Sequence, residues 1–185
     1  PDAKGERHIW TSLDDIPLVI QNAFISAEDH RFYSHPGVDV LAILRAVKSN
    51  FTEGHIVSGA STLTQQLSRI TYPRKRTYYD KLVELLRSLR IELLLDKEQI
   101  LELYLNRVPL GNNLVGVMAG SKVYFGKILS RLTHSEAAML AALPKAPGKL
   151  NPYGRNISSL IERKNWVLRK MNTNEHISFD MLHGS

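Results

Sequence analysis

Residues 17–37 read PLVIQNAFISAEDHRFYSHPG, an apolar stretch that ends in a group of charged and aromatic residues. Pro17 suits the first turn of a helix, and apolar residues continue from there to Ala27. A carboxylate at the end of that helix would have an apolar wall on one side and charges on the other, an environment that tunes proton transfer. A carboxylate of this segment, Glu28 or Asp29, could therefore serve in proton transfer, although from these residues alone an ordinary solvated helix terminus is the more common explanation.

Helical spacing of apolar residues continues through most of the chain, whereas the alternation typical of strands is hard to find. Asp39 and Ser61 are placed to begin helices, and capping boxes begin at Asp96 and Thr133. The clearest helix carries one apolar stripe made of Leu82, Leu85, Leu86, Leu89 and Leu93. A last helix is expected from Leu160 to about Met171, and a loop that allows close backbone approach between residues 111 and 120. The sequence therefore predicts a mainly α protein.

Size and charge narrow the class of protein further. The 185 residues, 43% of them hydrophobic, are enough for one domain, which we place at residues 1–182. Lys and Arg total 24 against 18 Asp and Glu, so the net charge of +6 favours an anionic partner: nucleic acid, phosphate or a membrane surface. The absence of cysteine excludes disulfides and thiolate metal sites.

The ends of the chain suggest a piece of a longer protein. The sequence begins at Pro1, and no apolar run approaches the ~18 residues of a membrane span. We interpret the chain as a soluble fragment lacking its anchor, and residues 183–185 as a remnant of expression cloning.

A basic segment follows a polar turn in the middle of the chain. Residues 59–66 read GASTLTQQ, a helix start whose free N–H groups suit an anionic or sugar ligand, although an ordinary N-cap explains it as simply. Five cations then fall within thirteen residues: Arg69, Arg74, Lys75, Arg76 and Lys81. Arginine and lysine together can hold a pyrophosphate, which makes this segment the candidate phosphate site. The interleaved Tyr72, Tyr78 and Tyr79 also fit a nucleic-acid surface, and a solvated charged face is a third explanation.

Taken in order, these segments resemble the glycosyltransferase domain (glycosyltransferase family 51) of class A penicillin-binding proteins and monofunctional peptidoglycan transglycosylases. The pattern Glu-Asp-x-x-Phe-x-x-His-x-Gly occupies residues 28–37, and Gly-x-Ser-Thr-x-Thr-Gln-Gln occupies residues 59–66. The third pattern, Arg-Lys-x-x-Glu, keeps Lys81 and Glu84 but has Asp80 in place of its arginine. The fourth spans residues 97–106, and the last spans residues 163–168, with Lys164 where a second arginine is usual. The resemblance covers residues 10–172, and residues 105–111 and 135–140 are most similar to the penicillin-binding protein 1C branch.

The resemblance implies a lysozyme-like, mainly helical fold, with a large lobe and a smaller membrane-facing lobe separated by a cleft. It implies polymerisation of lipid II into β-1,4-linked glycan, with inversion and release of undecaprenyl pyrophosphate, in cell wall biogenesis. The expected partners are lipid II, the lipid-linked growing glycan, the membrane surface and moenomycin-type inhibitors, at the extracytoplasmic face of the bacterial inner membrane. The apolar stretch from Val40 to Phe51 would lie at the lipid surface, or else pack in the core.

The resemblance also implies residue roles. Glu28 would be the base, and Glu84 would position the donor, directly or through Mg²⁺ or Mn²⁺ on its pyrophosphate, with no cofactor obligatory. Arg69, Arg76 and Lys81 would stabilise the departing pyrophosphate. Substrate binding or shaping of the site is expected of Asp29, Phe32, His35, Ser61, Thr62, Gln65 and Gln66. Glu102 and Asn106 are interpreted as structural.

Two other classes of protein also fit parts of this sequence. A lysozyme-like muramidase or lytic transglycosylase also uses a glutamate in a helical domain, but it needs no pyrophosphate site. A helical nucleic-acid-binding module would use the same cations and tyrosines, but it gives no role to the pattern around Glu28. We therefore expect no nucleic-acid partner.

Overall fold

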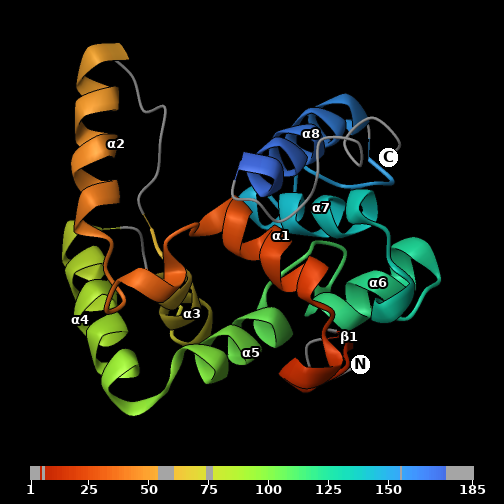
Figure 1. Ribbon diagram of the computed structural model, residues 1–185, viewed down its shortest axis with the longest axis horizontal. Helices are drawn as coiled ribbons and strands as arrows, with labels where there is room; N and C mark the ends of the chain where they lie inside the picture. The colour runs from red at the N-terminus through yellow and green to blue at the C-terminus, as the bar shows by residue number, and fades with distance from the viewer. Residues whose placement is uncertain (1–4, 6, 54–60, 74–76, 155, 174–185) are drawn as a thin grey trace. The chain divides into compact units, whose positions relative to one another are not determined.

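The computed structural model describes residues 5, 7–53, 61–73, 77–154 and 156–173, and these residues are mainly helical, as predicted (Figure 1). The helices are α1 (Leu18–Glu28), α2 (Val40–Glu53), α3 (Leu63–Thr71), α4 (Tyr78–Leu94), α5 (Lys97–Arg107), α6 (Val117–Phe125), α7 (His134–Ala142) and α8 (Ile157–Thr173). Four 3₁₀ turns join them: η1 (Leu13–Asp15), η2 (Phe32–Ser34), η3 (Leu129–Arg131) and η4 (Leu143–Lys145). Two short strands, β1 (Arg7–His8) and β2 (Leu114–Val115), pair in parallel. The chain forms two compact units, a larger one of residues 1–30 and 101–185 and a smaller one of residues 31–100.

The core of the larger unit is built by α1, α7 and α8, which lie against one another in Figure 1. The buried residues of α7 include Ala137, Ala138 and Ala141, whose small side chains let neighbouring helices approach closely. Phe24 of α1 is fully buried and packs edge-on against Tyr104, with ring centroids 6.2 Å apart. This packing fixes the C-terminal end of α1, where Glu28 lies.

The segment before α1 is tied to α5 by polar side chains. Asn106 accepts a hydrogen bond from the Thr11 amide and donates one to the Thr11 carbonyl, both at 2.8 Å. Glu102 accepts from the Leu13 amide at 2.8 Å. These contacts support the structural interpretation of Glu102 and Asn106.

The glycine-rich segment allows the close backbone approach that was predicted, but it is shorter than residues 111–120. Gly116 has φ +84°, and a Cβ there would lie 2.6 Å from the Asn106 carbonyl oxygen. Helix α6 begins directly afterwards, at Val117, so the last four residues of the predicted loop are helical. Only glycine is suited to this combination of positive φ and close contact.

The smaller unit contains α2, α3, α4 and the first turn of α5. Asp39 begins α2 as predicted, accepting a hydrogen bond from the Ala42 amide at 2.9 Å. The cap of α3 is Thr62 rather than Ser61, because the Thr62 hydroxyl accepts from the Gln65 amide and donates to the Gly37 carbonyl.

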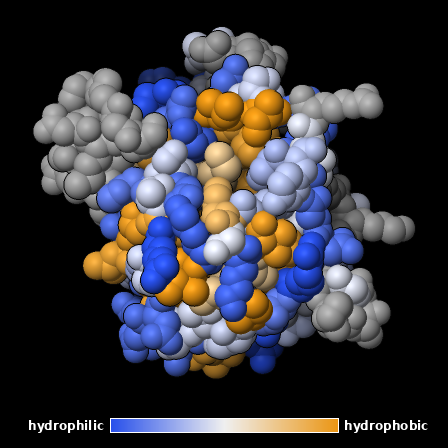
Figure 2. All heavy atoms as spheres, turned by 90° about the vertical axis from the view of Figure 1, so that its right-hand side faces the viewer, coloured by the Kyte–Doolittle hydropathy of each residue, from blue (hydrophilic) through white to orange (hydrophobic). Residues whose placement is uncertain are grey.

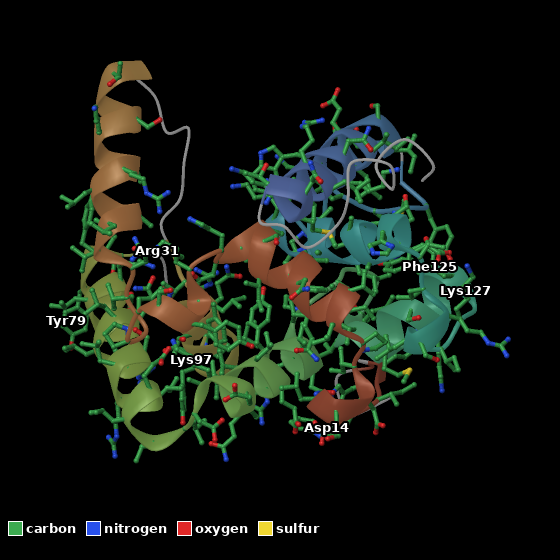
Figure 3. The ribbon with its side chains drawn as sticks, in the orientation of Figure 1. Asp14, Arg31, Tyr79, Lys97, Phe125 and Lys127 are labelled. Atoms are coloured by element: carbon green, nitrogen blue, oxygen red, sulfur yellow. The ribbon has the colours of Figure 1, made fainter. Side chains whose placement is uncertain are left out.

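The apolar stripe predicted on α4 is largely exposed. Leu82, Leu86 and Leu93 are 55%, 57% and 85% exposed, and Ser88 is the residue of α4 that is fully buried. The helix packs on α3 through its polar side because Lys81 and Glu84 bond to side chains of α3. Tyr79, labelled in Figure 3, also points away from the helix and is 70% exposed.

Helix α2 also exposes apolar side chains, since Val40, Leu41 and Leu44 are each more than half exposed. This exposure is compatible with the lipid-surface role predicted for residues 40–51, which stays a prediction. None of the helices in the described part of the chain combines the length and apolar character that crossing a bilayer requires. On the face where Figure 2 looks onto α6, hydrophobic residues are scattered among hydrophilic ones.

Candidate active site

Glu28 is the last residue of α1, and its side chain is only 12% exposed. Its carboxylate Oε1 lies 3.8 Å from Nη2 of Arg163, which α8 contributes. The packing of α1 on α8 therefore places a guanidinium beside the candidate base. An opposite charge at this distance favours the ionised carboxylate, which is the form that can accept a proton.

Arg163 is itself held in place by two other contacts. Its guanidinium lies over the Trp166 ring, 3.8 Å from the centroid, and its Nη2 donates to the Ala27 carbonyl at 3.5 Å. Burial lowers the pKa of Arg163, and the Glu28 carboxylate partly opposes that effect. An arginine stays protonated in proteins, so the positive charge beside Glu28 is permanent. Sequence reasoning placed Arg163 in the last motif without assigning it to the site.

The side chains of the next motif residues after Glu28 lie inside the protein. Asp29 and His35 are buried, and Phe32 is fully buried, so any part that Phe32 takes in binding would be indirect. Lys97, labelled in Figure 3, lies over the Phe32 ring at 4.5 Å and donates to the His35 carbonyl at 2.7 Å. Its ammonium also pairs with Glu92 at 2.8 Å. Lys97 thus fixes the turn that carries Phe32 and His35, a role that sequence reasoning missed.

A pocket of about 780 Å³ opens in the smaller unit between α3 and α4. Its lining consists of Ser61, Ser68, Arg69, Tyr72, Thr77, Tyr78, Asp80, Lys81, Glu84 and Arg87. Lys81 Nζ donates to Ser61 Oγ at 2.9 Å, to Gln65 Oε1 at 3.3 Å and to Glu84 Oε1. Arg69 lies 3.7 Å from the other oxygen of Glu84. Two of the lining cations, Arg69 and Lys81, are therefore organised around the carboxylate of Glu84.

The structure brings together five of the predicted site residues, namely Ser61, Gln65, Arg69, Lys81 and Glu84. Thr62 and Gln66 are buried side chains of the α3 start, and Arg76 lies outside the described residues. Asp80, which replaces the expected arginine, helps begin α4: its amide donates to Thr77 Oγ1, and its carboxylate accepts from that hydroxyl at 2.6 Å.

Comparison with known proteins gives consistent matches. The model of the transglycosylase family matches residues 2–172. Penicillin-binding protein 1A of Aquifex aeolicus (strain VF5) is 44% identical over 179 residues, which are 92% of this chain and 24% of that protein. Penicillin-binding protein 1A of Escherichia coli (strain K12) is 46% identical over 167 residues, 90% of this chain and 20% of that protein.

A solved structure agrees with these sequence matches. The crystal structure of penicillin-binding protein 1A from Haemophilus influenzae is similar with a TM-score of 0.59 and 27% identity, covering 97% of this chain and 17% of that one. The chain thus spans about a quarter or less of the length of these relatives, and its assignment to the 1C branch stays a prediction. The match over nearly all of the chain shows that it belongs to the transglycosylase family, the peptidoglycan glycosyltransferases that its motifs predicted.

Proposed function

We propose that this chain polymerises lipid II into β-1,4-linked glycan strands, releasing undecaprenyl pyrophosphate with inversion at the anomeric carbon. The observation that carries the proposal is the pocket in which Lys81 and Arg69 are arranged around Glu84. Such a cluster of donors suits a leaving group that carries phosphate charge.

In this reaction the 4-hydroxyl of the acceptor N-acetylglucosamine attacks the anomeric carbon of the donor. Glu28 takes the hydroxyl proton as the new C–O bond forms, and the bond to the pyrophosphate oxygen breaks with its electron pair leaving on that oxygen. Lys81 and Arg69 stabilise the charge that develops there, and Glu84 holds the two cations in position. Attack opposite to the leaving group inverts the configuration.

A divalent ion has limited support from the residues of this pocket. Among the described lining residues the carboxylates are Asp80 and Glu84, and Glu84 already pairs with Lys81 and Arg69. Mg²⁺ prefers about six oxygen ligands in an octahedral arrangement, so these side chains alone do not make a metal site. The proposed steps therefore rest on the side chains of the protein itself.

Two other functions fit the pocket less well. A muramidase or lytic transglycosylase cleaves glycan and has no phosphate to stabilise, so it gives Arg69 and Lys81 no task. Because the chain belongs to the transglycosylase family, a nucleic-acid-binding function has no support either. We place the active domain at the extracytoplasmic face of the bacterial inner membrane, where lipid-linked substrate is exposed.

The test is polymerisation of labelled lipid II in detergent, with glycan length measured on a gel. The parent chain should form long glycan, and Glu28→Gln should lower the rate at least about 100-fold because general-base catalysis contributes that much. Glu162→Gln removes an exposed carboxylate of α8 and should leave the rate unchanged. A folded parent chain that forms no polymer, or cleaves glycan instead, would refute the proposal.

A further inference from the structure

The contacts between α3 and α4 advance in the same direction along both helices. Lys81 bonds to Ser61 and Gln65, and one turn further Glu84 pairs with Arg69. One more turn along α4, the Arg87 guanidinium lies over the Tyr72 ring, 4.6 Å from its centroid, at the C-cap of α3. The pocket wall therefore has three successive levels, and the catalytic proposal uses only the first two.

The charges lining the pocket are not balanced at the third level. Arg69 and Lys81 share the carboxylate of Glu84, and Asp80 accepts a hydrogen bond from Thr77. Arg87 lines the same pocket, but within the described part of the chain no carboxylate lies within ion-pair distance of it. The described lining thus has three cations and two acids, and Arg87 is the cation that forms no ion pair with a described residue.

The contact with Tyr72 leaves the donors of Arg87 available. An aromatic ring covers one face of the planar guanidinium, while the N–H groups lie in its plane and point outward. Stacking also restricts the side chain, so less rotamer entropy is lost when a ligand binds. A guanidinium held in this way matches the two oxygens of a phosphate group.

We propose that Arg87, positioned by Tyr72, is an additional binding residue for the diphosphate of the lipid-linked donor. Arg87 lies six positions after Lys81, about 9 Å along the helix axis, a span that these two long side chains can close onto one diphosphate. Arg87 supplies the positive charge that the third motif loses at Asp80, whose carboxylate is used to begin α4. This inference rests on the proposed function, since it takes the pocket as the donor site.

The test is the affinity of the full chain for farnesyl diphosphate, farnesyl monophosphate and farnesol, measured by titration calorimetry. Arg87→Gln should raise the Kd for the diphosphate about ten-fold, the loss expected for one charge-assisted contact, and change the Kd for the monophosphate less. Arg90→Gln is the matched control, because it removes an exposed cation from the same helix outside the pocket lining. Equal Kd values for Arg87→Gln and Arg90→Gln would overturn the inference, as would failure of the parent to bind the diphosphate.

Two further variants separate binding from folding. Tyr72→Leu keeps the guanidinium but removes its platform, and should raise the Kd about three-fold, whereas Arg87→Lys should recover part of the lost affinity. An equal loss of farnesol binding in Arg87→Gln would indicate a general disruption and overturn the proposal.

If the parent polymerises lipid II but binds diphosphate independently of Arg87, only this inference fails. If Arg87-dependent binding occurs in a chain that forms no polymer, the polymerase proposal fails and the diphosphate site stands.

Discussion

Replacing Arg163 by methionine removes the positive charge beside Glu28 while keeping a long apolar stem. The two side chains are 19% and 12% exposed, and their charged atoms lie 3.8 Å apart. The substitution also removes the guanidinium from the Trp166 ring and from the Ala27 carbonyl. Glu28 would then be left as a largely buried carboxylate without its neighbouring cation.

The size of the effect follows from burial and distance. Removing one partner of a fully buried ion pair costs about 3–5 kcal/mol. The separation of 3.8 Å exceeds hydrogen-bond length and both side chains retain some exposure, so we expect a loss of about 2 kcal/mol in the free energy of unfolding. For a chain of this size that loss corresponds to a fall of about 4–8 °C in Tm.

The assay is urea denaturation of Arg163→Met, Glu28→Gln and the double variant, with Arg169→Met as an exposed control on the same helix. The double variant should be more stable than the sum of the single losses predicts, because neither charge is left without the other. Additive losses, or a loss in Arg163→Met no larger than in Arg169→Met, would refute the pairing.

The pH dependence of the activity is a second measurement, and a purely structural role of Arg163 would leave it unchanged. Without the guanidinium the ionised form of Glu28 is less favoured, so the acidic limb of the pH–rate profile should move towards higher pH. Arg163→Lys keeps a positive charge and should move the limb less. An unchanged profile in Arg163→Met would show that Arg163 does not act through Glu28.

Three further predictions concern stability and metal dependence. Burial tends to raise the pKa of Glu136, but hydrogen bonds from Lys127 and Thr133 outweigh it and the pKa is lowered overall. Glu136→Gln should therefore lower the free energy of unfolding, measured by urea titration near neutral pH, by about 1 kcal/mol. The difference between the parent and the variant should shrink below pH 4.5, because the carboxylate of the folded parent is then protonated. Gly116→Ala should lower the free energy of unfolding by about 2–4 kcal/mol in the same assay, because its Cβ would meet the Asn106 carbonyl at a positive φ. Gly126→Ala is the control: Gly126 also has a positive φ, but its Cβ would meet no atom, so the loss should be smaller. Lipid II polymerisation should remain measurable after chelation with EDTA. If EDTA abolished polymerisation and Mg²⁺ restored it, the prediction that no ion is obligatory would be wrong.

The helix starts were predictable because capping is local in sequence. Asp96 accepts from the Gln99 amide while the Gln99 side chain accepts from the Asp96 amide. Thr133 and Glu136 form the same reciprocal pair at the start of α7. Each signal needs only residues three positions apart, so a single sequence contains it. The family motifs likewise contained four residues of the pocket lining, Ser61, Asp80, Lys81 and Glu84, and the three-residue spacing of Lys81 and Glu84 places them on one helix face.

The remaining features depend on packing between distant segments. Periodicity identified the apolar stripe of α4, but it could not show that the helix packs through the opposite side. The contact of Arg163 with Glu28 joins residues 135 positions apart, and no local rule predicts it. The stacking of Arg87 on Tyr72 depends similarly on how α3 and α4 pack. Sequence reasoning therefore located the chemical groups but not the partners that determine what each can do.

The environments of the two glutamates argue for different roles. Glu84 and Glu28 have similar side-chain exposure, 11% and 12%. Glu84 accepts a close hydrogen bond from Lys81 and lies 3.7 Å from Arg69, so its carboxylate is held between two cations. The Arg163 guanidinium lies 3.8 Å from the Glu28 carboxylate, beyond hydrogen-bond distance. Differences of this kind between titratable groups can separate a base from a residue that organises charge. These environments fit the proposed roles, in which Glu28 is the base and Glu84 holds Lys81 and Arg69 for the leaving diphosphate.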